Sequence, residues 1–175
     1  IGDLPNLPAF RGGIPLGPML QEKFGIPTFI NNDGDLFVYG EAIGGFLPWV
    51  NEQLEKAGSP KRYKNLFGVT MGTGFGGGIV RNGELYIGDN SVAGEVWTLR
   101  HKLQRSWNAE EGCCIRAVRR EYGRLTNTPF DNVPEPKVLF DIANGNAEGD
   151  QAAAKEAFRL LGEVAGDAMG EALTL

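Results

Sequence analysis

Gly72-Thr73-Gly74-Phe75-Gly76-Gly77-Gly78 is the stretch that decides the fold, because of what surrounds it. The apolar run Leu66–Met71 precedes the glycines and has the composition of a buried strand. Asn82-Gly83 is typical of a type I′ turn, and residues 84–87 return as a further strand. The glycines also satisfy the G-x-G-x-x-G pattern, but a dinucleotide-binding fold needs a helix directly after the third glycine. The sequence therefore predicts a glycine-rich strand hairpin and not a dinucleotide site.

Glycines at a corner between two strands can serve an anion. Because they lack Cβ atoms, successive backbone N–H groups can approach and surround it, and the hydroxyl of Thr73 adds a donor. A nucleotide phosphate fits that need. The alternative is a tight hairpin or bulge in which the glycines have a purely structural purpose.

A candidate catalytic acid, Asp33, follows a predicted strand. Residues 26–30 form a β-branched and aromatic run, which predicts a short buried strand with Asn31-Asn32-Asp33 at its end. Open α/β sheets place ligand-contacting side chains at that end of a strand. A carboxylate there can accept the proton of a substrate hydroxyl as its oxygen attacks phosphorus. Asn32 can both donate and accept, which suits vicinal sugar hydroxyls. The alternative is that Asp33 or Asp35 only caps the following helix.

Three longer segments have helical periodicity. Residues 35–57 predict one amphipathic helix with a kink or break at Pro48. Residues 111–125 predict a second helix, with its arginines as a solvated stripe opposite the apolar face. Gln151–Leu173 predicts a third, with glycines at four-residue steps that suggest a face pressed against a neighbouring element: Gly162, Gly166 and Gly170. Strands followed by helices, with hairpins inserted, indicate a mixed α/β architecture.

The composition bounds the class of protein. A chain of 175 residues, 42% hydrophobic, can bury a core, and its net charge of −5 gives no reason to expect a nucleic-acid partner. We find neither an apolar run long enough for a membrane helix nor a secretion signal, so we expect the cytoplasm. Cys113 and Cys114 have no zinc-site spacing and are predicted to be buried or idle thiols. The chain begins without Met and ends inside an apolar helical pattern, so we expect a fragment of a longer protein.

Three motifs in order give the chain a resemblance to a known family. Asn32-Asp33 with Gly40-Glu41, the glycine stretch with Asn82-Gly83, and Ala93-Gly94-Glu95 resemble, in order and spacing, the ROK family of sugar kinases and sugar-responsive repressors. The resemblance implies the actin-like, ribonuclease-H-like ATPase fold, with two lobes that close on a sugar. It assigns residues 1–48 to the smaller lobe and 49–175 to part of the larger one.

The resemblance also assigns roles to residues. Asp33 matches the catalytic base and a sugar ligand, and Asn32 and Glu95 match ligands of sugar hydroxyls. Without the resemblance, Glu95 would pass for a surface glutamate in a turn. Glu110 or Glu111 is the candidate for a further sugar-contacting glutamate. The second phosphate loop of the family matches five residues: Gly72, Thr73, Gly74, Gly76 and Gly77.

The chain also departs from the family pattern. Thr98 stands where a histidine is usual, and His101 comes three residues too late. Asp35 stands where asparagine is common. The family's cysteine-rich zinc cluster is absent from the sequence around Cys113, so we predict no zinc.

The resemblance places the first phosphate loop before Ile1 and the adenine-side glycines after Leu175. We therefore expect ATP- and Mg²⁺-dependent phosphorylation of a hexose or amino-hexose by a longer, homodimeric protein, with this segment alone inactive. The alternative is a non-catalytic, sugar-sensing repressor, which a helix-turn-helix upstream would indicate.

Overall fold

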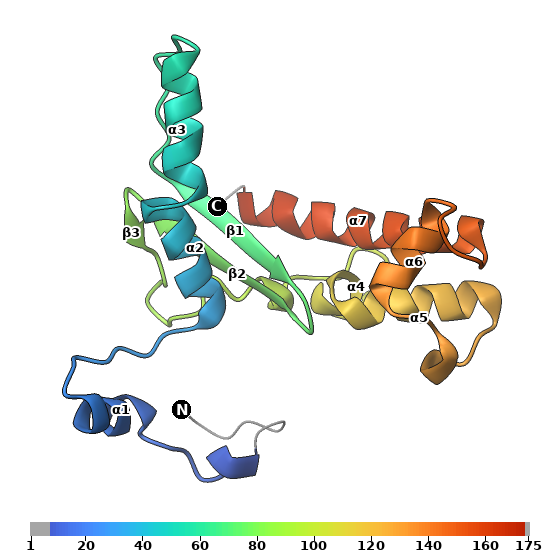
Figure 1. Cartoon of the computed structure of the whole chain (residues 1–175), viewed down its shortest axis with the longest axis horizontal. Helices are drawn as coiled ribbons and strands as arrows, with labels where there is room; N and C mark the ends of the chain where they lie inside the picture. The colour runs from blue at the N-terminus through green and yellow to red at the C-terminus, as the bar shows by residue number, and fades with distance from the viewer. Residues whose placement is uncertain (1–7, 174–175) are drawn as a thin grey trace. The chain divides into compact units, whose positions relative to one another are not determined.

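The computed structural model describes residues 8–173 (Figure 1). Its elements, in chain order, are η1 (Pro8–Phe10), α1 (Leu16–Phe24), α2 (Asp33–Ile43), α3 (Phe46–Lys56), β1 (Leu66–Met71), β2 (Phe75–Arg81), β3 (Glu84–Leu85), η2 (Val96–Thr98), α4 (Glu110–Cys113), α5 (Ile115–Thr126), η3 (Phe130–Asn132), α6 (Pro136–Ala143) and α7 (Gln151–Leu173). The chain divides into two compact units, residues 1–33 and 34–175.

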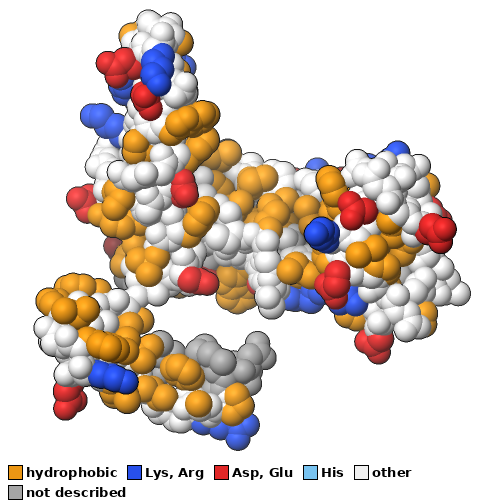
Figure 2. All heavy atoms as spheres, in the orientation of Figure 1, with side chains coloured by type: hydrophobic (Ala, Val, Ile, Leu, Met, Phe, Trp, Pro, Cys, Tyr) orange, Lys and Arg blue, Asp and Glu red, His pale blue; other side chains and the backbone are white. Residues whose placement is uncertain are grey.

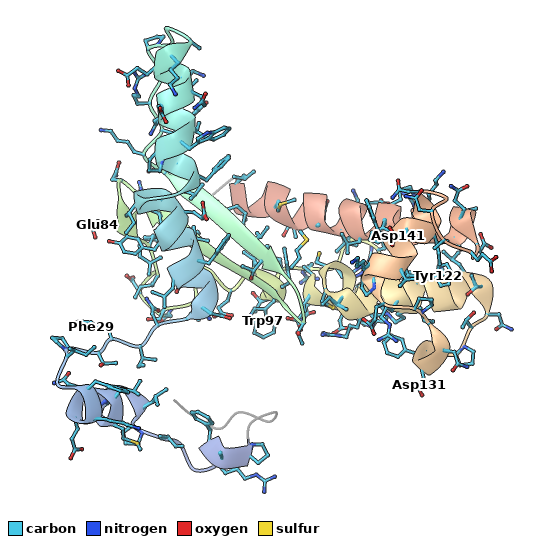
Figure 3. The ribbon with its side chains drawn as sticks, viewed as in Figure 1. Phe29, Glu84, Trp97, Tyr122, Asp131 and Asp141 are labelled. Carbon is cyan, nitrogen blue, oxygen red and sulfur yellow. The ribbon has the colours of Figure 1, made fainter. Side chains whose placement is uncertain are left out.

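The first unit contains η1, α1 and an extended segment. Gly17 of α1 is buried under that segment, since a Cβ there would stand 3.3 Å from Cγ1 of Ile30. The predicted buried strand at 26–30 is wrong for the described residues: the segment joins no sheet there, and Phe29, labelled in Figure 3, is 89% exposed. A strand forms only where a neighbour takes its hydrogen bonds, and local composition does not reveal that neighbour.

The second unit contains an antiparallel sheet in the order β1-β2-β3. The predicted hairpin is confirmed, with Gly68 opposite Gly78 and Met71 opposite Phe75. The turn after β2 has positive φ at both central residues, 53° at Asn82 and 85° at Gly83, as a type I′ turn requires. The returning strand β3 is shorter than predicted, Glu84–Leu85 instead of 84–87. Within residues 8–173, β1 pairs with β2 alone, so its outer edge has no partner strand there.

The predicted helix at 35–57 is two helices. The chain breaks at Gly44 and Gly45, and the carboxylate of Glu41 accepts the N–H of Phe46 at 2.7 Å as α3 begins. Pro48 lies in the first turn of α3, where a missing N–H is tolerated, so the predicted kink at Pro48 is wrong. Figure 2 shows apolar side chains at the surface over α2 and the start of α3. The large apolar residues that are exposed in these helices include Phe37, Phe46 and Trp49.

Helix α7 contributes to two apolar cores. Its first half packs with α5 and α6, where Ala154 and Ala157 meet Val118, Tyr122 and Leu139. Its second half packs against the sheet, and this cluster includes Phe75, Val96, Cys113, Val164 and Ala168. Figure 1 shows α7 running above α5, with α6 beside its first turns.

The glycines of α7 lie on its other side. Gly162, Gly166 and Gly170 are exposed, and a Cβ on any of them would meet nothing within 4 Å in the described part of the chain. The predicted close packing of this face is therefore wrong for residues 8–173. Within the same range, no helix is both long and apolar enough to span a membrane.

Candidate active site

The bend of the hairpin consists of residues 72–74, between β1 and β2. The N–H of Gly72 donates to the carbonyl oxygen of Gly74 at 3.0 Å, which closes the turn. Thr73 is exposed at the tip. Within residues 8–173, the N–H groups of Thr73 and Gly74 donate no hydrogen bond. The tip therefore keeps two amides and a hydroxyl available to an anion.

Several of the glycines lie close to neighbouring atoms inside the molecule. A Cβ at Gly74 would come within 2.7 Å of Oε2 of Glu110, and one at Gly76 within 2.6 Å of Oγ1 of Thr70. A Cβ at Gly77 would press on Val96 at 3.0 Å. The structural alternative therefore applies most strongly to Gly77, where the carbonyl oxygen of Gly68 also stands within 3.1 Å of the added Cβ. At Gly74 the neighbour is the end of the flexible Glu110 side chain, and a Cβ at Gly72 would meet nothing within 4 Å.

Helix α2 lies directly on the hairpin. A Cβ at Gly68 would stand 2.5 Å from Cγ2 of Val38, and a Cβ at Gly78 would stand 3.1 Å from both Val38 and the Cα of Asp35. The paired glycines let the first turns of α2 approach the backbone of both strands. Asp33 is the first residue of this helix, two positions before Asp35.

The Ala93-Gly94-Glu95 motif packs against both the glycine strand and the start of α2. A Cβ at Gly94 would come within 2.8 Å of the carbonyl oxygen of Gly77 and 3.0 Å of Oδ1 of Asp35. Burial raises the pKa of the Asp35 carboxyl, and the neighbouring negative charge of Glu95 raises it further. The structure thus brings α2, the glycine strand and the Glu95 turn together. The carboxylate of Glu95 accepts the indole N–H of Trp97.

Thr98 and His101 both have structural partners. The hydroxyl of Thr98 donates to the carbonyl oxygen of Glu95 at 2.7 Å, within its own turn. His101 is 7% exposed, and its Nδ1 accepts the N–H groups of Leu103 and Gln104 at 3.2 and 3.1 Å. Burial lowers the pKa of His101, and the positive charge of Arg120 lowers it further, which favours the neutral ring. The polar atoms of Thr98 and His101 named here are thus used in local hydrogen bonds.

The arginines at the start of α5 form an ion-pair network with α4. Arg116 binds Glu110 at 2.9 Å and also binds Glu111, and Arg120 binds Glu111 at 2.9 Å. The hydrogen bonds from Arg116 and Arg120 lower the pKa of Glu111 to about 2. The guanidinium of Arg120 also stacks on the ring of Trp107 at 4.2 Å.

The predicted solvated arginine stripe is therefore wrong for Arg116, Arg119 and Arg120, whereas Arg124 pairs with Glu121 at the exposed surface. Arg119, on the same helix, donates to the carbonyl oxygen of Val133 at 2.8 Å. The partners of these arginines lie on other elements, up to 43 residues away in the sequence. Helical periodicity separates polar from apolar faces but does not show which polar residues meet across elements.

The carboxylate of Glu110 faces the hairpin. Its Oε2 accepts the N–H of Phe75 at 3.1 Å and its Oε1 accepts the Arg116 guanidinium. A carboxylate has about four acceptor positions, so these two bonds leave capacity for a further donor. A sugar contact by Glu110 or Glu111 stays a prediction.

A cavity of about 410 Å³ borders the ion-pair network. Its lining includes His101, Trp107, Glu111, Arg120 and Leu161. Thr73 and Glu95 are not among the lining residues, so Glu111 is the member of the candidate site that borders this cavity.

The two adjacent cysteines are structural. Cys113 and Cys114 are free and buried, as predicted. Within residues 8–173, no three His, Cys, Asp or Glu side chains gather in a way that could hold a metal ion.

Comparison with known proteins identifies the class. The family model described as the ROK family matches residues 1–174, so the chain belongs to the ROK family. The predicted resemblance is confirmed, and so is the fold class: a part of the actin-like ATPase fold with a mixed arrangement of helices and strands.

Individual members of the family show how similar the chain is to known sugar kinases. The chain is 55% identical to a glucokinase from Parabacteroides distasonis, with a TM-score of 0.92 over 99% of this chain and 48% of that one. It is 32% identical to the N-acetyl-D-glucosamine kinase of Vibrio vulnificus, over 89% of this chain and 50% of the relative. A glucokinase from Streptomyces griseus, solved with glucose and AMPPNP, shares the fold at a TM-score of 0.65 and 21% identity. The chain thus spans about half the length of the relatives it matches.

Proposed function

We propose that this chain is the central part of an ATP-dependent sugar kinase that phosphorylates a hydroxyl of a hexose or amino-hexose. One observation carries the proposal: the helix that begins at Asp33 rests on the glycine hairpin, and the Glu95 turn packs against both, through Gly94, Gly77 and Asp35. A phosphate acceptor and a phosphate donor must meet within a few ångströms for the transfer to occur. The sugar kinases named above support the same assignment.

In the proposed reaction, the carboxylate of Asp33 accepts the proton of the sugar hydroxyl as that oxygen attacks the terminal phosphorus of ATP, and ADP leaves. Asn32, Asp33 and Glu95 bind and orient the sugar hydroxyls, and Glu110 is the proposed further sugar ligand. Gly72, Thr73, Gly74, Gly76 and Gly77 contribute the bend that holds phosphate. The amides of Thr73 and Gly74, which donate no hydrogen bond within residues 8–173, suit that part.

Mg²⁺ would neutralise the phosphate charge during the transfer. We propose that the ion is bound largely by the phosphate oxygens of the nucleotide, as is usual for Mg²⁺ in kinases. The family resemblance further supports a two-lobed, cytoplasmic, homodimeric protein, with residues 1–48 in the smaller lobe and the rest in the larger. The repressor alternative gains no support from the kinases named above.

The decisive experiment measures ATP consumption by the full-length protein against a panel of hexoses and amino-hexoses. We expect one of them to give saturable turnover. In the same protein, Asp33→Asn should lower kcat by orders of magnitude while the Kd of the sugar changes little, because the amide keeps the hydrogen-bonding shape but accepts no proton. Near-normal turnover of this variant would exclude the assigned role.

A further inference from the structure

The backbone of the glycine bend is held from one side by the start of α5. The N–H of Ile115 donates to the carbonyl oxygen of Gly72 at 2.9 Å. The guanidinium of Arg116 donates to the carbonyl oxygen of Thr73 at 3.0 Å. Two consecutive carbonyl groups of the bend are thus turned toward the same helix terminus.

This anchoring fixes the direction of two amides. The carbonyl of one residue and the N–H of the next belong to one planar trans peptide and point in opposite directions. Since the carbonyls of Gly72 and Thr73 face α5, the N–H groups of Thr73 and Gly74 face away from it. Those are the two amides that donate no hydrogen bond within residues 8–173. The bend therefore presents them together to an incoming anion.

The guanidinium of Arg116, which binds the Thr73 carbonyl, is itself fixed by other partners. Besides the Thr73 carbonyl, Arg116 binds the carboxylates of Glu110 and Glu111, and Glu111 is bound by Arg120. Glu110 in turn accepts the N–H of Phe75, the first residue after the bend. A planar fork of donors can satisfy these partners at once, which a lysine ammonium on a flexible stem does less well.

We infer that Arg116 is a positioning residue for the phosphate site: it orients the Thr73 and Gly74 amides toward the nucleotide without touching the reacting atoms. The inference rests on the proposed function, because it takes the ligand at the bend to be a nucleoside triphosphate. It assigns a role to a residue that the helical pattern alone treats as solvated surface.

The test compares nucleotide binding by variants of the full-length protein. Calorimetry with a non-hydrolysable ATP analogue should show affinity lowered roughly tenfold to a hundredfold in Arg116→Ala, because misdirected amides no longer meet the phosphates. The affinity for adenosine, which lacks phosphates, and the Kd of the sugar should stay within about twofold of the original values. Arg116→Lys should recover part of the loss, since it keeps one donor and the charge.

A matched control is Arg124→Ala, on the same helix. Arg124 pairs at the surface with Glu121, three residues before it, and contacts no part of the bend. It should leave the affinity for the ATP analogue unchanged.

The inference is overturned if Arg116→Ala binds the ATP analogue as well as the original protein, or loses adenosine and ATP affinity equally while its Tm falls. If Arg116→Ala does not fold, the test uses Arg116→Lys with the ATP analogue and adenosine. The inference is overturned if this variant changes the affinity for both ligands by the same factor. These outcomes differ from failure of the proposed function, in which the unaltered protein neither binds the ATP analogue nor phosphorylates any sugar of the panel.

Discussion

Val38 rests on Gly68: a Cβ at Gly68 would stand 2.5 Å from Cγ2 of Val38, which is itself fully buried. This contact sets the distance between α2 and β1. The helix that begins at the proposed catalytic aspartate is therefore held at a height that only a glycine in the strand permits.

Gly68→Ala should destabilise the protein through this contact. The added methyl group must push α2 outward or force Val38 from its rotamer, so we expect the free energy of unfolding to fall by roughly 1–3 kcal/mol. Denaturant unfolding of the full-length variant measures the change. Gly40→Ala is the matched control, because a Cβ there meets nothing within 4 Å in the described part of the chain and alanine favours a helix. Equal effects of the two substitutions would contradict the proposed steric cause.

Asp35→Asn should raise stability at neutral pH. Burial and the charge of Glu95 raise the pKa of Asp35 above its ordinary value, so the folded state holds this proton more tightly than the unfolded state. Stability is consequently lost as the pH rises through the window between the unfolded and folded pKa values. We expect Asp35→Asn to have a higher Tm than the original protein at pH 7 and an advantage that shrinks toward pH 3. A lower Tm at pH 7 would show that Asp35 acts there mainly as a hydrogen-bonded anion.

Glu111 should make stability depend on pH in the opposite direction. The hydrogen bonds from Arg116 and Arg120 lower its pKa to about 2, below the ordinary value of 4.5. Its contribution is therefore present above pH 4.5 and is lost as the pH falls toward 2. At pH 7, Glu111→Gln should lower the free energy of unfolding by roughly 1–3 kcal/mol.

The control for Glu111 is Glu156→Gln. Glu156 pairs with Arg159 on the exposed surface of α7, where solvent screens the interaction. Its substitution should change stability less than that of Glu111 at pH 7 and should leave the acid dependence in place. If the stabilities of Glu111→Gln and Glu156→Gln fell in the same way with acid pH, the ion-pair network would not be the source of the acid dependence.

Native thiols should be unreactive. Cys113 and Cys114 are 0% and 1% exposed, and burial raises the pKa of Cys113 to about 12, so its thiolate is scarce at pH 8. A colourimetric thiol reagent should label neither residue within minutes in the folded protein and both of them in denaturant. Fast labelling without denaturant would mean that the α4 region opens readily.

Local sequence signals identified the hairpin well because its determinants are local. Asn82-Gly83 has the positive φ angles that a type I′ turn needs, and this preference belongs to the residues themselves. The sequence pattern predicts the helix break at Pro48, whereas the structure has it at Gly44 and Gly45. Proline is tolerated in a first helical turn, and two glycines are sufficient to end a helix.

The sequence pattern does not predict contacts between residues that are far apart in the chain. Arg116 binds Thr73, 43 positions away, and the segment 26–30 joins no sheet within residues 8–173. Motif order predicts the acidic candidates Asp33 and Glu95, and their roles stay predictions. The role of Gly94, which fits against Gly77 and Asp35, follows only from coordinates.

The unpartnered side of β1 has a practical consequence. Its row of backbone donors and acceptors is a template on which another chain can add a strand. If residues 1–175 are produced alone, copies of the segment can join there edge to edge, and aggregation would compete with folding. Material for biophysical work should therefore contain the complete protein, or carry a charged substitution that discourages strand addition along β1.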